Sequence, residues 1–331
     1  MAWLCVPVSE SMNCPVCLDP ASATALIGTD YFFQVTPRTF HLSRCTACDS
    51  LFLDPLPEQA DIAGFYPATY WWKSSSTALK KLEMLYRRAA LRDHFTFIVN
   101  AAVKVHSSSQ PPRILDVGCG SGTLLGLLKA HGFDVLGLDY SREAAAIARS
   151  ENDVEVVVGS LAEAHFQDAS FDLVTLFHVM EHVTNPGEVL GEVRRILKPT
   201  GRLVIQVPNI ESWQFRFFRE RWYGLDIPRH VIDYSNKALQ QLLTRTGFTV
   251  HRVRHFNLRD NAQALASSLF PSLDPVSRTV RNARRAVEES PLGAWVRHIA
   301  YFTVVVFVSP FAVAEAAAGS GATIMIEGAK E

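Results

Sequence analysis

Short apolar runs alternate with amphipathic segments along most of the chain after residue 112. The apolar runs predict strands at 113–117, 133–138, 154–158, 171–176, 202–207 and 248–256. Several of the segments between them have the apolar spacing of helices, and we expect helices at 121–131, 141–150, 186–197 and 235–246. Such an alternation is typical of an α/β fold with a doubly wound, Rossmann-like sheet.

One more apolar run, at 323–328, predicts a strand near the end of the sequence. Roughly sixty residues separate it from the strand at 248–256, far more than a hairpin loop contains. The intervening residues, 257–320, are rich in helix-like sequence. We therefore expect a helical insertion before the last strand of the sheet.

The first 110 residues follow a different pattern. Many prolines and two Cys-x-x-Cys pairs occur in the first sixty, with strand-like pieces at 31–35 and 39–44. Apolar residues at helical spacing predict a long helix over 77–106, followed by a linker at 107–112. We accordingly divide the chain into an N-terminal module (1–60), an aromatic linker and helix (61–110), the α/β core (111–256), the partly apolar insertion (257–320) and the final core strand (321–331).

Composition narrows the class of protein. The chain has 331 residues, of which 48% are hydrophobic and 20% charged, as in globular proteins. Its formal net charge of −1 argues against a nucleic-acid partner held by bulk charge. Residues 1–10 contain no basic segment and only a short apolar run, so we expect no signal peptide and a cytoplasmic location.

A glycine-rich turn follows the first core strand. The sequence Ile114-Leu-Asp-Val-Gly-Cys-Gly-Ser-Gly122 places glycines at alternate positions before a predicted helix. Glycine lets the backbone approach a ligand where a Cβ atom would collide. The spacing differs from the dinucleotide fingerprint G-x-G-x-x-G, because Thr123 stands where the third glycine should be.

This turn resembles motif I of the class I methyltransferases, which bind S-adenosylmethionine (SAM), and further motifs match in order over about residues 111–256. The resemblance implies a seven-stranded sheet with an antiparallel last strand, and a carboxylate, Asp116, near the methionine part of SAM. Asp139, about twenty positions after the turn, can accept hydrogen bonds from the ribose hydroxyls. The residues expected to contact SAM are Asp116, Gly118, Gly120, Gly122, Asp139, Tyr140, Ser160, Leu161 and Phe177.

Four cysteines form two pairs of the kind that bind metal. Cys14 and Cys17 are separated from Cys45 and Cys48 by a strand-like stretch. Four thiolates suit tetrahedral, structural Zn²⁺, which would also stabilise a segment with few core residues. Reduced, packed thiols or a redox pair remain the alternatives.

The N-terminal pattern is similar to that of a bacterial subfamily of SAM methyltransferases with zinc-ribbon-like modules. The resemblance rests on the cysteine pairs, Pro55-Leu-Pro57, and the tyrosines at 66 and 70 before the glycine turn. Some members of that subfamily act on sugars, lipids or natural products. The aromatic cluster at 65–72 either lies against the cofactor and acceptor or packs the module onto the core.

The segment His178-Val-Met-Glu-His182 spells the H-x-x-E-H pattern of one group of zinc proteases. It directly follows a predicted strand rather than lying on a helix, so we do not expect protease chemistry. In the methyltransferase frame this loop faces cofactor and acceptor. His178, His182 and the later His230 are candidates for a general base, or they orient the loop.

Three further residues are candidates for acceptor binding. Asn209 lies just after the strand at 202–207, and Trp213 follows it. Arg229 belongs to a Pro-Arg-His segment resembling one that approaches the pocket in this family, and it could bind an acceptor carboxylate or phosphate. The alternative for Arg229 is a salt bridge to Asp226 or Asp233.

Residues 299–314 carry no charge, and Pro310 lies among them. As a helix they would extend about 24 Å, less than a hydrocarbon core of about 30 Å, so we expect no membrane span. Two interpretations stay open: a helix buried against the insertion, or an apolar surface that contacts a membrane. The nearby arginines, from 278 to 297, are either a flank for anionic lipid or an ordinary mixed-charge surface.

These features together predict a SAM-dependent methyltransferase with a structural zinc site. The acceptor would be an O, N or C nucleophile on a small molecule, a sugar or a lipid-linked intermediate. A zinc-ribbon RNA methyltransferase is one alternative, although the first fifty residues contain only two basic side chains, Arg38 and Arg44. A SAM-binding assembly module without catalysis is the other.

Overall fold

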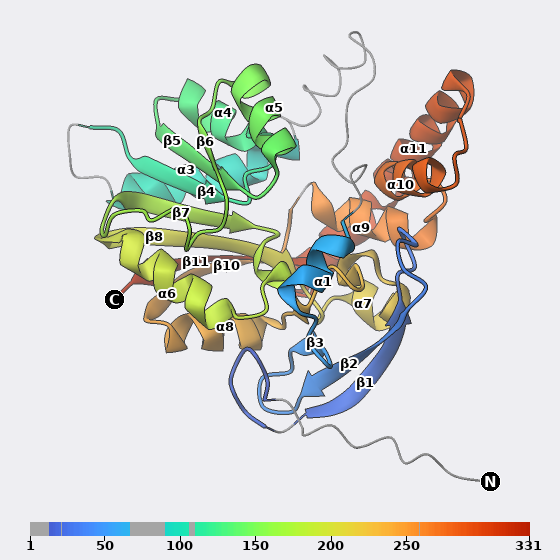
Figure 1. Cartoon of the computed structure of the whole chain (residues 1–331), viewed down its shortest axis with the longest axis horizontal. Helices are drawn as coiled ribbons and strands as arrows, with labels where there is room; N and C mark the ends of the chain where they lie inside the picture. The colour runs from blue at the N-terminus through green and yellow to red at the C-terminus, as the bar shows by residue number, and fades with distance from the viewer. Residues whose placement is uncertain (1–12, 21, 67–89, 106–109, 258) are drawn as a thin grey trace.

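The structure is a computed structural model of the chain, and it describes residues 13–20, 22–66, 90–105, 110–257 and 259–331 (Figure 1). Several expectations fall outside these ranges. They concern residues 1–10, the aromatic residues at 70–72, the first part of the helix expected at 77–106, and the first half of the linker that follows it.

A seven-stranded sheet forms the centre of the described structure. Its strand order is β10-β11-β8-β7-β4-β5-β6. The neighbours from β8 to β6 pair in parallel, whereas β11 is antiparallel to both β8 and β10. The bounds are β4 Arg113–Val117, β5 Asp134–Asp139, β6 Val156–Val158, β7 Phe171–Phe177, β8 Leu197–Pro208, β10 Phe248–Arg254 and β11 Thr323–Lys330. The α/β, Rossmann-like class with an antiparallel last strand is thus confirmed.

Helices cover both faces of this sheet (Figure 1). Alternate strand residues point to opposite faces, so Ile114 packs with α3 and α4, whereas Leu115 packs with α6 and α8. The helices are α3 Arg92–Val105, α4 Thr123–Ala130, α5 Arg142–Asn152, α6 Pro186–Ile196 and α8 Asn236–Arg245. Ser141 and Ser235 cap α5 and α8 with their hydroxyls, which accept hydrogen bonds from backbone N–H groups three residues on. The four helices expected after residue 120 are all present.

The N-terminal residues form a second, four-stranded sheet in the order β1-β2-β3-β9. β1 is Ser22–Thr29, β2 is Thr39–Cys45 and β3 is Leu51–Leu53. The fourth strand, β9, is Ile232–Asp233 and comes from the core segment of the chain. The helix α1 Gln59–Gly64 follows β3.

The strand expected at 31–35 is wrong. These residues form a turn after β1, because the Asp30 carboxylate accepts hydrogen bonds from the N–H groups of Phe33 and Val35. Gln34 has a positive φ of 56°, which no strand permits. Phe32 and Phe33 are buried by packing against Val280 of the insertion.

Three helices lie between β10 and β11, as expected for the insertion: α9 Asp260–Leu269, α10 Pro275–Arg284 and α11 Pro291–Ala317. Tyr301, Val305 and Val308 of α11 pack against α9. The N-terminal half of α7 Trp213–Phe218 is tied to α11, since Gln214 donates two hydrogen bonds to the buried Glu315 carboxylate, at 2.9 and 2.8 Å.

The length of α11 differs from the expectation. It contains 27 residues with Pro310 inside, so it extends about 40 Å and by length and composition could cross a membrane. The expected shortfall against a bilayer was therefore wrong. The chain nevertheless re-enters the central sheet at Thr323, and one face of α11 packs on α9. We therefore describe α11 as part of the folded insertion.

Candidate functional site

Part of the predicted site lies at the carboxyl edge of the central sheet. β4, β5 and β7 are adjacent and parallel, so the loops after Val117, Asp139 and Phe177 leave the sheet on the same side. In open α/β sheets ligands bind in the crevice outside these carboxyl ends. This arrangement brings the glycine turn, Asp139 and the His178–His182 segment to one edge.

The glycine turn has the backbone that its sequence indicates. Gly118, Gly120 and Gly122 all have positive φ, at 73°, 53° and 69°. A Cβ on Gly118 would lie 2.5 Å from Val179 Cγ2, and one on Gly122 would lie 2.9 Å from the Ala148 Cβ. A Cβ on Gly120 meets no described atom within 4 Å. The outer glycines thus permit close packing, and the middle one leaves backbone open to a ligand.

Asp139 is held in place by the turn that it faces. Its two carboxylate oxygens accept hydrogen bonds from the N–H groups of Gly120 and Ser141, each at 2.8 Å. Burial raises the pKa of this carboxyl, although both hydrogen bonds oppose the rise. Each oxygen has a second lone pair, so the pinned carboxylate can still accept hydrogen bonds from a ligand's hydroxyl groups.

Asp116 lies beneath the turn, at the end of β4. Burial, as the main cause, raises its pKa to about 7, with a further contribution from the charge of Asp139; the Thr175 hydroxyl, which donates a 2.6 Å hydrogen bond, opposes the rise. A cationic ligand group nearby would favour the ionised form. The glycine turn and the two carboxylates therefore fit SAM, the partly cationic ligand that the motif implies.

The remaining residues expected to contact SAM differ in their exposure and in their partners. Tyr140 is 69% exposed beside Asp139, whereas Leu161 is buried. Ser160 interacts with Glu163, which accepts hydrogen bonds from its N–H and its hydroxyl. Phe177 packs edge to face on His94 at 4.8 Å between ring centroids. These positions are compatible with a cofactor site, but their role as contacts stays a prediction.

His178 is held between two carboxylates. Its Nδ1 lies 3.1 Å from Glu181 Oε1 and its Nε2 lies 3.2 Å from Asp260 Oδ2. Burial alone would lower the pKa of His178, but Asp260 and Glu181 outweigh it and raise the pKa to about 10. An imidazolium has no lone pair to accept a proton, so this geometry does not favour His178 as a general base at neutral pH.

Behind His178 lies a buried polar network that the sequence did not indicate. Asp260, at the start of α9, accepts hydrogen bonds from Gln206 Nε2 and Asn257 Nδ2 at 2.7 and 2.9 Å. Asn257 also donates to Gln206 Oε1 at 2.7 Å and lies 3.0 Å from His94 Nε2. These partners are up to 163 residues apart, and they come from α3, β8 and the start of the insertion.

His182 and His230 have different surroundings from His178. His182 Nδ1 lies 2.9 Å from the Arg229 carbonyl oxygen and 2.8 Å from the Tyr66 hydroxyl. The rings of His182 and His230 are in edge contact, at 4.7 Å between centroids. Burial, together with the neighbouring His182, lowers the pKa of His230 to about 4. His230 is therefore a neutral imidazole near pH 7.

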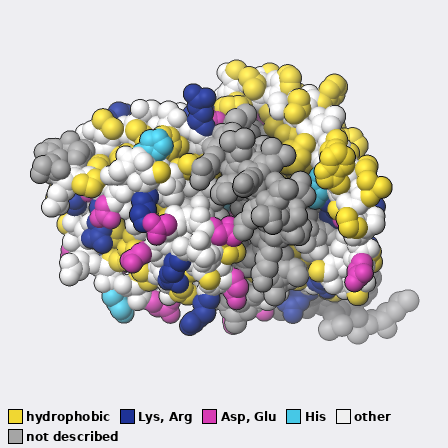
Figure 2. Space-filling model, turned by 90° about the horizontal axis from the view of Figure 1, so that it is seen from above, with side chains coloured by type: hydrophobic (Ala, Val, Ile, Leu, Met, Phe, Trp, Pro, Cys, Tyr) yellow, Lys and Arg dark blue, Asp and Glu magenta, His cyan; other side chains and the backbone are white. Residues whose placement is uncertain are grey.

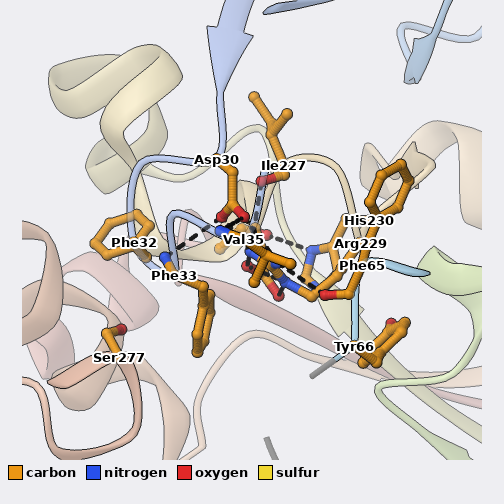
Figure 3. A network of polar contacts seen from close by, with 12 residues as sticks. Asp30, Phe32, Phe33, Val35, Phe65, Tyr66, Ile227, Arg229, His230 and Ser277 are labelled. Carbon is orange, nitrogen blue, oxygen red and sulfur yellow. Dashed lines mark hydrogen bonds and ion pairs between the residues drawn. The ribbon is translucent and has the colours of Figure 1, made fainter. Parts of the chain in front are cut away.

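Arg229 forms the buried ion-pair network of Figure 3 rather than facing an open pocket. Its side chain is fully buried; Nη2 donates to Asp30 and Asp226 at 2.7 Å each, and Nε donates to Asp226. Nη1 lies within 3.3 Å of both Asp30 and the Phe65 carbonyl oxygen. The proposed salt bridge to Asp226 is present, with Asp30 in place of Asp233, so the structure gives no support to acceptor binding by Arg229.

Asn209 and Trp213 also have structural partners. Asn209 is fully buried, donates to the Gly321 carbonyl oxygen at 2.8 Å and accepts from the Glu211 N–H at 2.9 Å. Trp213 lies against Phe311 of α11, at 5.9 Å between ring centroids, and is 37% exposed. Neither contact favours the acceptor-binding role that the sequence suggested for these residues.

The four N-terminal cysteines converge. Their sulfurs lie within 4.8 Å of one another, with Cys14 and Cys48 at 3.6 Å and Cys17 and Cys45 at 3.5 Å. All four are free thiols. Zn–S bonds of about 2.3 Å in a tetrahedron place the sulfurs about 3.8 Å apart, so this cluster fits a closed, structural zinc site.

Several bacterial proteins are similar in sequence to part of this chain. An uncharacterized 37.1 kDa protein of transposon TN4556 from Streptomyces fradiae is 32% identical over 56% of this chain and 57% of its own length. A probable SAM-dependent methyltransferase of Mycobacterium tuberculosis is 36% identical over 41% of this chain and 48% of its own. A ubiquinone biosynthesis O-methyltransferase of Paraburkholderia phymatum is 29% identical over 39% and 60%. The matches thus span about half to three fifths of the length of these relatives.

A solved SAM-dependent methyltransferase from Archaeoglobus fulgidus aligns with 75% of this chain and 94% of its own, at 19% identity and a TM-score of 0.46. Residues 51–253 match the family model described as a methyltransferase domain. That match includes the strands and loops that carry the glycine turn, Asp139 and the three histidines. The chain therefore belongs to the class I SAM-dependent methyltransferases.

Proposed function

We propose that this protein transfers the methyl group of SAM to a nucleophile on a small molecule, a sugar or a lipid-linked intermediate. One observation carries the proposal: the open backbone at Gly120 lies beside Asp139 at the carboxyl edge of the sheet. SAM supplies an activated methyl group on a sulfonium, which leaves by in-line displacement. The protein then has chiefly to position and desolvate the two reactants.

The residues of the turn divide the work of binding SAM. Asp139, pinned by two backbone N–H groups, accepts hydrogen bonds from the ribose hydroxyls. Asp116 faces the cationic methionine end. Because burial raises the pKa of Asp116 to about 7, binding of a cation there favours loss of its proton. Tyr140, Leu161 and Phe177 form the apolar surroundings of the adenine.

Where the acceptor must lose a proton, His182 or His230 is better placed than His178 to take it. His178 is paired with Glu181 and Asp260 and holds its own proton to about pH 10. His230 is neutral near pH 7. The likeness to a protein named as an O-methyltransferase favours an oxygen nucleophile, and the net charge of −1 does not favour RNA.

The cysteine cluster is proposed to hold one structural Zn²⁺. The site joins the turn before β1 to the end of β2 and the turn that follows it, and its four ligands leave no open coordination position for chemistry. Ser235, which caps α8 of the core, donates a 2.8 Å hydrogen bond to the Cys48 carbonyl oxygen. Zinc binding would therefore also stabilise the position of the core segment that carries His230 and β9.

The outer face of α11 is proposed to contact a lipid surface. Figure 2 shows hydrophobic side chains gathered on the α10–α11 side of the molecule, and the exposed fractions of Phe307, Val306 and Leu292 are 84%, 72% and 72%. The nearby Arg278 is buried and paired with Glu289 at 3.1 Å, and Arg297 pairs with the same carboxylate. Because these two arginines are already paired, we expect the contact to depend on buried apolar area and not to require anionic lipid.

Calorimetry with SAM tests the central proposal. We expect micromolar binding by the wild type, loss of binding in Asp139→Ala, and about one zinc per chain in both. Asp134→Ala is the matched control, because Asp134 lies at the other end of the same strand in an exposed ion pair with Arg113. A folded wild type that does not bind SAM would overturn the proposal and favour the assembly role.

A further inference from the structure

Three side chains outside the glycine turn lie close to one another. Glu181 and His182 lie in η1 Met180–His182, directly after β7, and His230 lies just before β9. One ligand atom from each lies within 4.8 Å of the others, and His230 Nε2 is 3.9 Å from Glu181 Oε1. His178, the first residue of the H-x-x-E-H pattern, points its nitrogens at carboxylates instead.

Each of the two imidazoles has a backbone carbonyl oxygen beside its Nδ1, as many metal-binding histidines do. His182 Nδ1 lies 2.9 Å from the Arg229 carbonyl oxygen, which can only accept, and 2.8 Å from the Tyr66 hydroxyl. His230 Nδ1 donates to the Gly224 carbonyl oxygen at 2.8 Å. A backbone acceptor on one ring nitrogen fixes the tautomer and leaves the other nitrogen unprotonated. The Nε2 atoms of both residues are therefore available as ligands.

Glu181 supplies the carboxylate. Its side chain is fully buried, and Oε2 has no hydrogen-bond partner among the residues that the structure describes. A buried carboxylate oxygen without a partner is costly, and a cation would compensate it. The backbone around it is held, since Glu181 O accepts from Val231 N–H at 2.8 Å and Met180 O accepts from the Tyr234 hydroxyl at 3.1 Å.

We propose that Glu181, His182 and His230 bind a divalent first-row transition metal, at a site separate from the cysteine cluster. Two imidazoles and one carboxylate favour Mn²⁺, Fe²⁺, Co²⁺ or Zn²⁺ over Mg²⁺, which prefers oxygen ligands. Three protein ligands leave coordination positions open, as in catalytic metal sites. The cysteine cluster has four ligands and leaves none.

The open positions would take an oxygen atom of the methyl acceptor, and this part of the inference rests on the proposed function. A bound metal lowers the pKa of a coordinated hydroxyl, so the acceptor would reach the methyl group as its oxyanion. His182 and His230 would then act as ligands and not as general bases. The proton released from the acceptor goes to solvent.

Cobalt titration of the full-length, metal-depleted protein tests the site by spectroscopy. Thiolate-bound Co²⁺ shows an intense sulfur-to-metal charge-transfer band, whereas Co²⁺ bound by two imidazoles and a carboxylate lacks it. We expect wild type to bind one equivalent without that band in addition to the thiolate-bound one. Glu181→Gln and His182→Ala should weaken the former at least about tenfold and leave the charge-transfer band intact.

His131→Ala is the matched control, because His131 lies at the exposed end of α4 with Nδ1 on the Leu127 carbonyl oxygen. Glu181→Gln keeps the shape of the side chain, and far-UV circular dichroism shows whether it folds. Absence of the second equivalent in wild type, or its retention in both folded variants, would overturn the proposal. Metal binding without methyl transfer would overturn only the proposed function, and methyl transfer unaffected by loss of this metal would overturn the acceptor-oxygen role.

Discussion

The cofactor side and the histidine side of the candidate site are built differently. The cofactor side, with Gly118, Gly120 and Asp139, comes from one stretch of 26 residues, 114–139. It is held by hydrogen bonds from backbone N–H groups. The other side joins η1, the segment around His230 and the N-terminal sheet, and it is held by buried side-chain pairs between distant residues. Local geometry defines the first, and tertiary contacts define the second.

This difference predicts different responses to substitution. On the cofactor side, a change should alter binding of SAM more than stability, because the backbone carries the structure. On the histidine side, a change should alter stability first, because buried charges depend on their partners. The following experiments test that contrast, beginning with the largest expected effect.

Arg229→Met should destabilise the protein by about 3–5 kcal/mol, because it leaves Asp30 and Asp226 as buried carboxylates without their cation. Urea unfolding measures the change in the free energy of unfolding. Arg195→Met is the control: Arg195 pairs with Asp168 and Glu192 at the surface, where ion pairs contribute little. Equal effects of the two substitutions would contradict the role given to the Arg229 network.

Gly120→Ala should weaken SAM binding by more than about tenfold while changing stability by about 1–2 kcal/mol, the cost of a Cβ at positive φ. The added methyl would occupy the open space that we assign to SAM. Gly132→Ala carries a comparable strain, at φ 89° with no described atom within 4 Å of its Cβ, but lies beyond α4. Calorimetry and thermal unfolding of both variants separate binding from strain; a similar loss of affinity in Gly132→Ala would refute the assignment.

SAM affinity should rise about tenfold between pH 6 and pH 8. The pKa of Asp116 is raised by burial to about 7, so at pH 6 most of the carboxyl is protonated and a cationic ligand must first displace that proton. Calorimetry across this range measures the profile, with Asp116→Asn as reference. If the profiles of wild type and variant run parallel, Asp116 does not face the cation.

The same group has the opposite effect on folding. Its pKa is higher in the folded protein than in the unfolded chain, where the reference value is 3.8. The unfolded chain therefore binds fewer protons between pH 3.8 and about 7, and the contribution of Asp116 to stability declines as pH rises through that window. Asp116→Asn should remove this part of the pH dependence of the free energy of unfolding.

Phe307→Glu should have the smallest effect on stability, within about 0.5 kcal/mol, because the side chain is 84% exposed. It should nevertheless greatly reduce sedimentation of the protein with phosphatidylcholine vesicles, if α11 contacts lipid. Val103→Glu serves as the control, because Val103 of α3 is 65% exposed. Unchanged sedimentation of Phe307→Glu, or none by wild type, would leave α11 with no membrane role.

Much of the central fold could be predicted because each strand and helix has its own periodicity. β4 was expected at 113–117 and is found there, and β10 and β11 lie where the apolar runs placed them. The turn at Asp30 shows the limit: an aromatic run suggested a strand, but one side-chain carboxylate that caps two N–H groups ended it. A two-residue strand such as β9 has too little sequence to give any periodic signal.

The candidate site shows the same boundary. The glycine turn and the acidic residue after β5 could be found from spacing, because both lie within one strand–turn–helix–strand unit. Asp260 carried no signal, since it acts on His178 across 82 residues. The H-x-x-E-H pattern was visible, but which of its histidines pairs with carboxylates, and which joins His230, depends on side-chain directions.

By itself the sequence determined the order of strands and helices, the glycine turn and the grouping of four cysteines, because periodicity, positive-φ backbone and short ligand spacing are local properties. The tertiary structure alone decided that Arg229 is a buried ion-pair partner of Asp30, that His178 lies between the carboxylates of Glu181 and Asp260, and that Glu181, His182 and His230 lie close together. Burial and charge pairing depend on residues far apart along the chain, and only the folded arrangement brings those residues within a few ångströms.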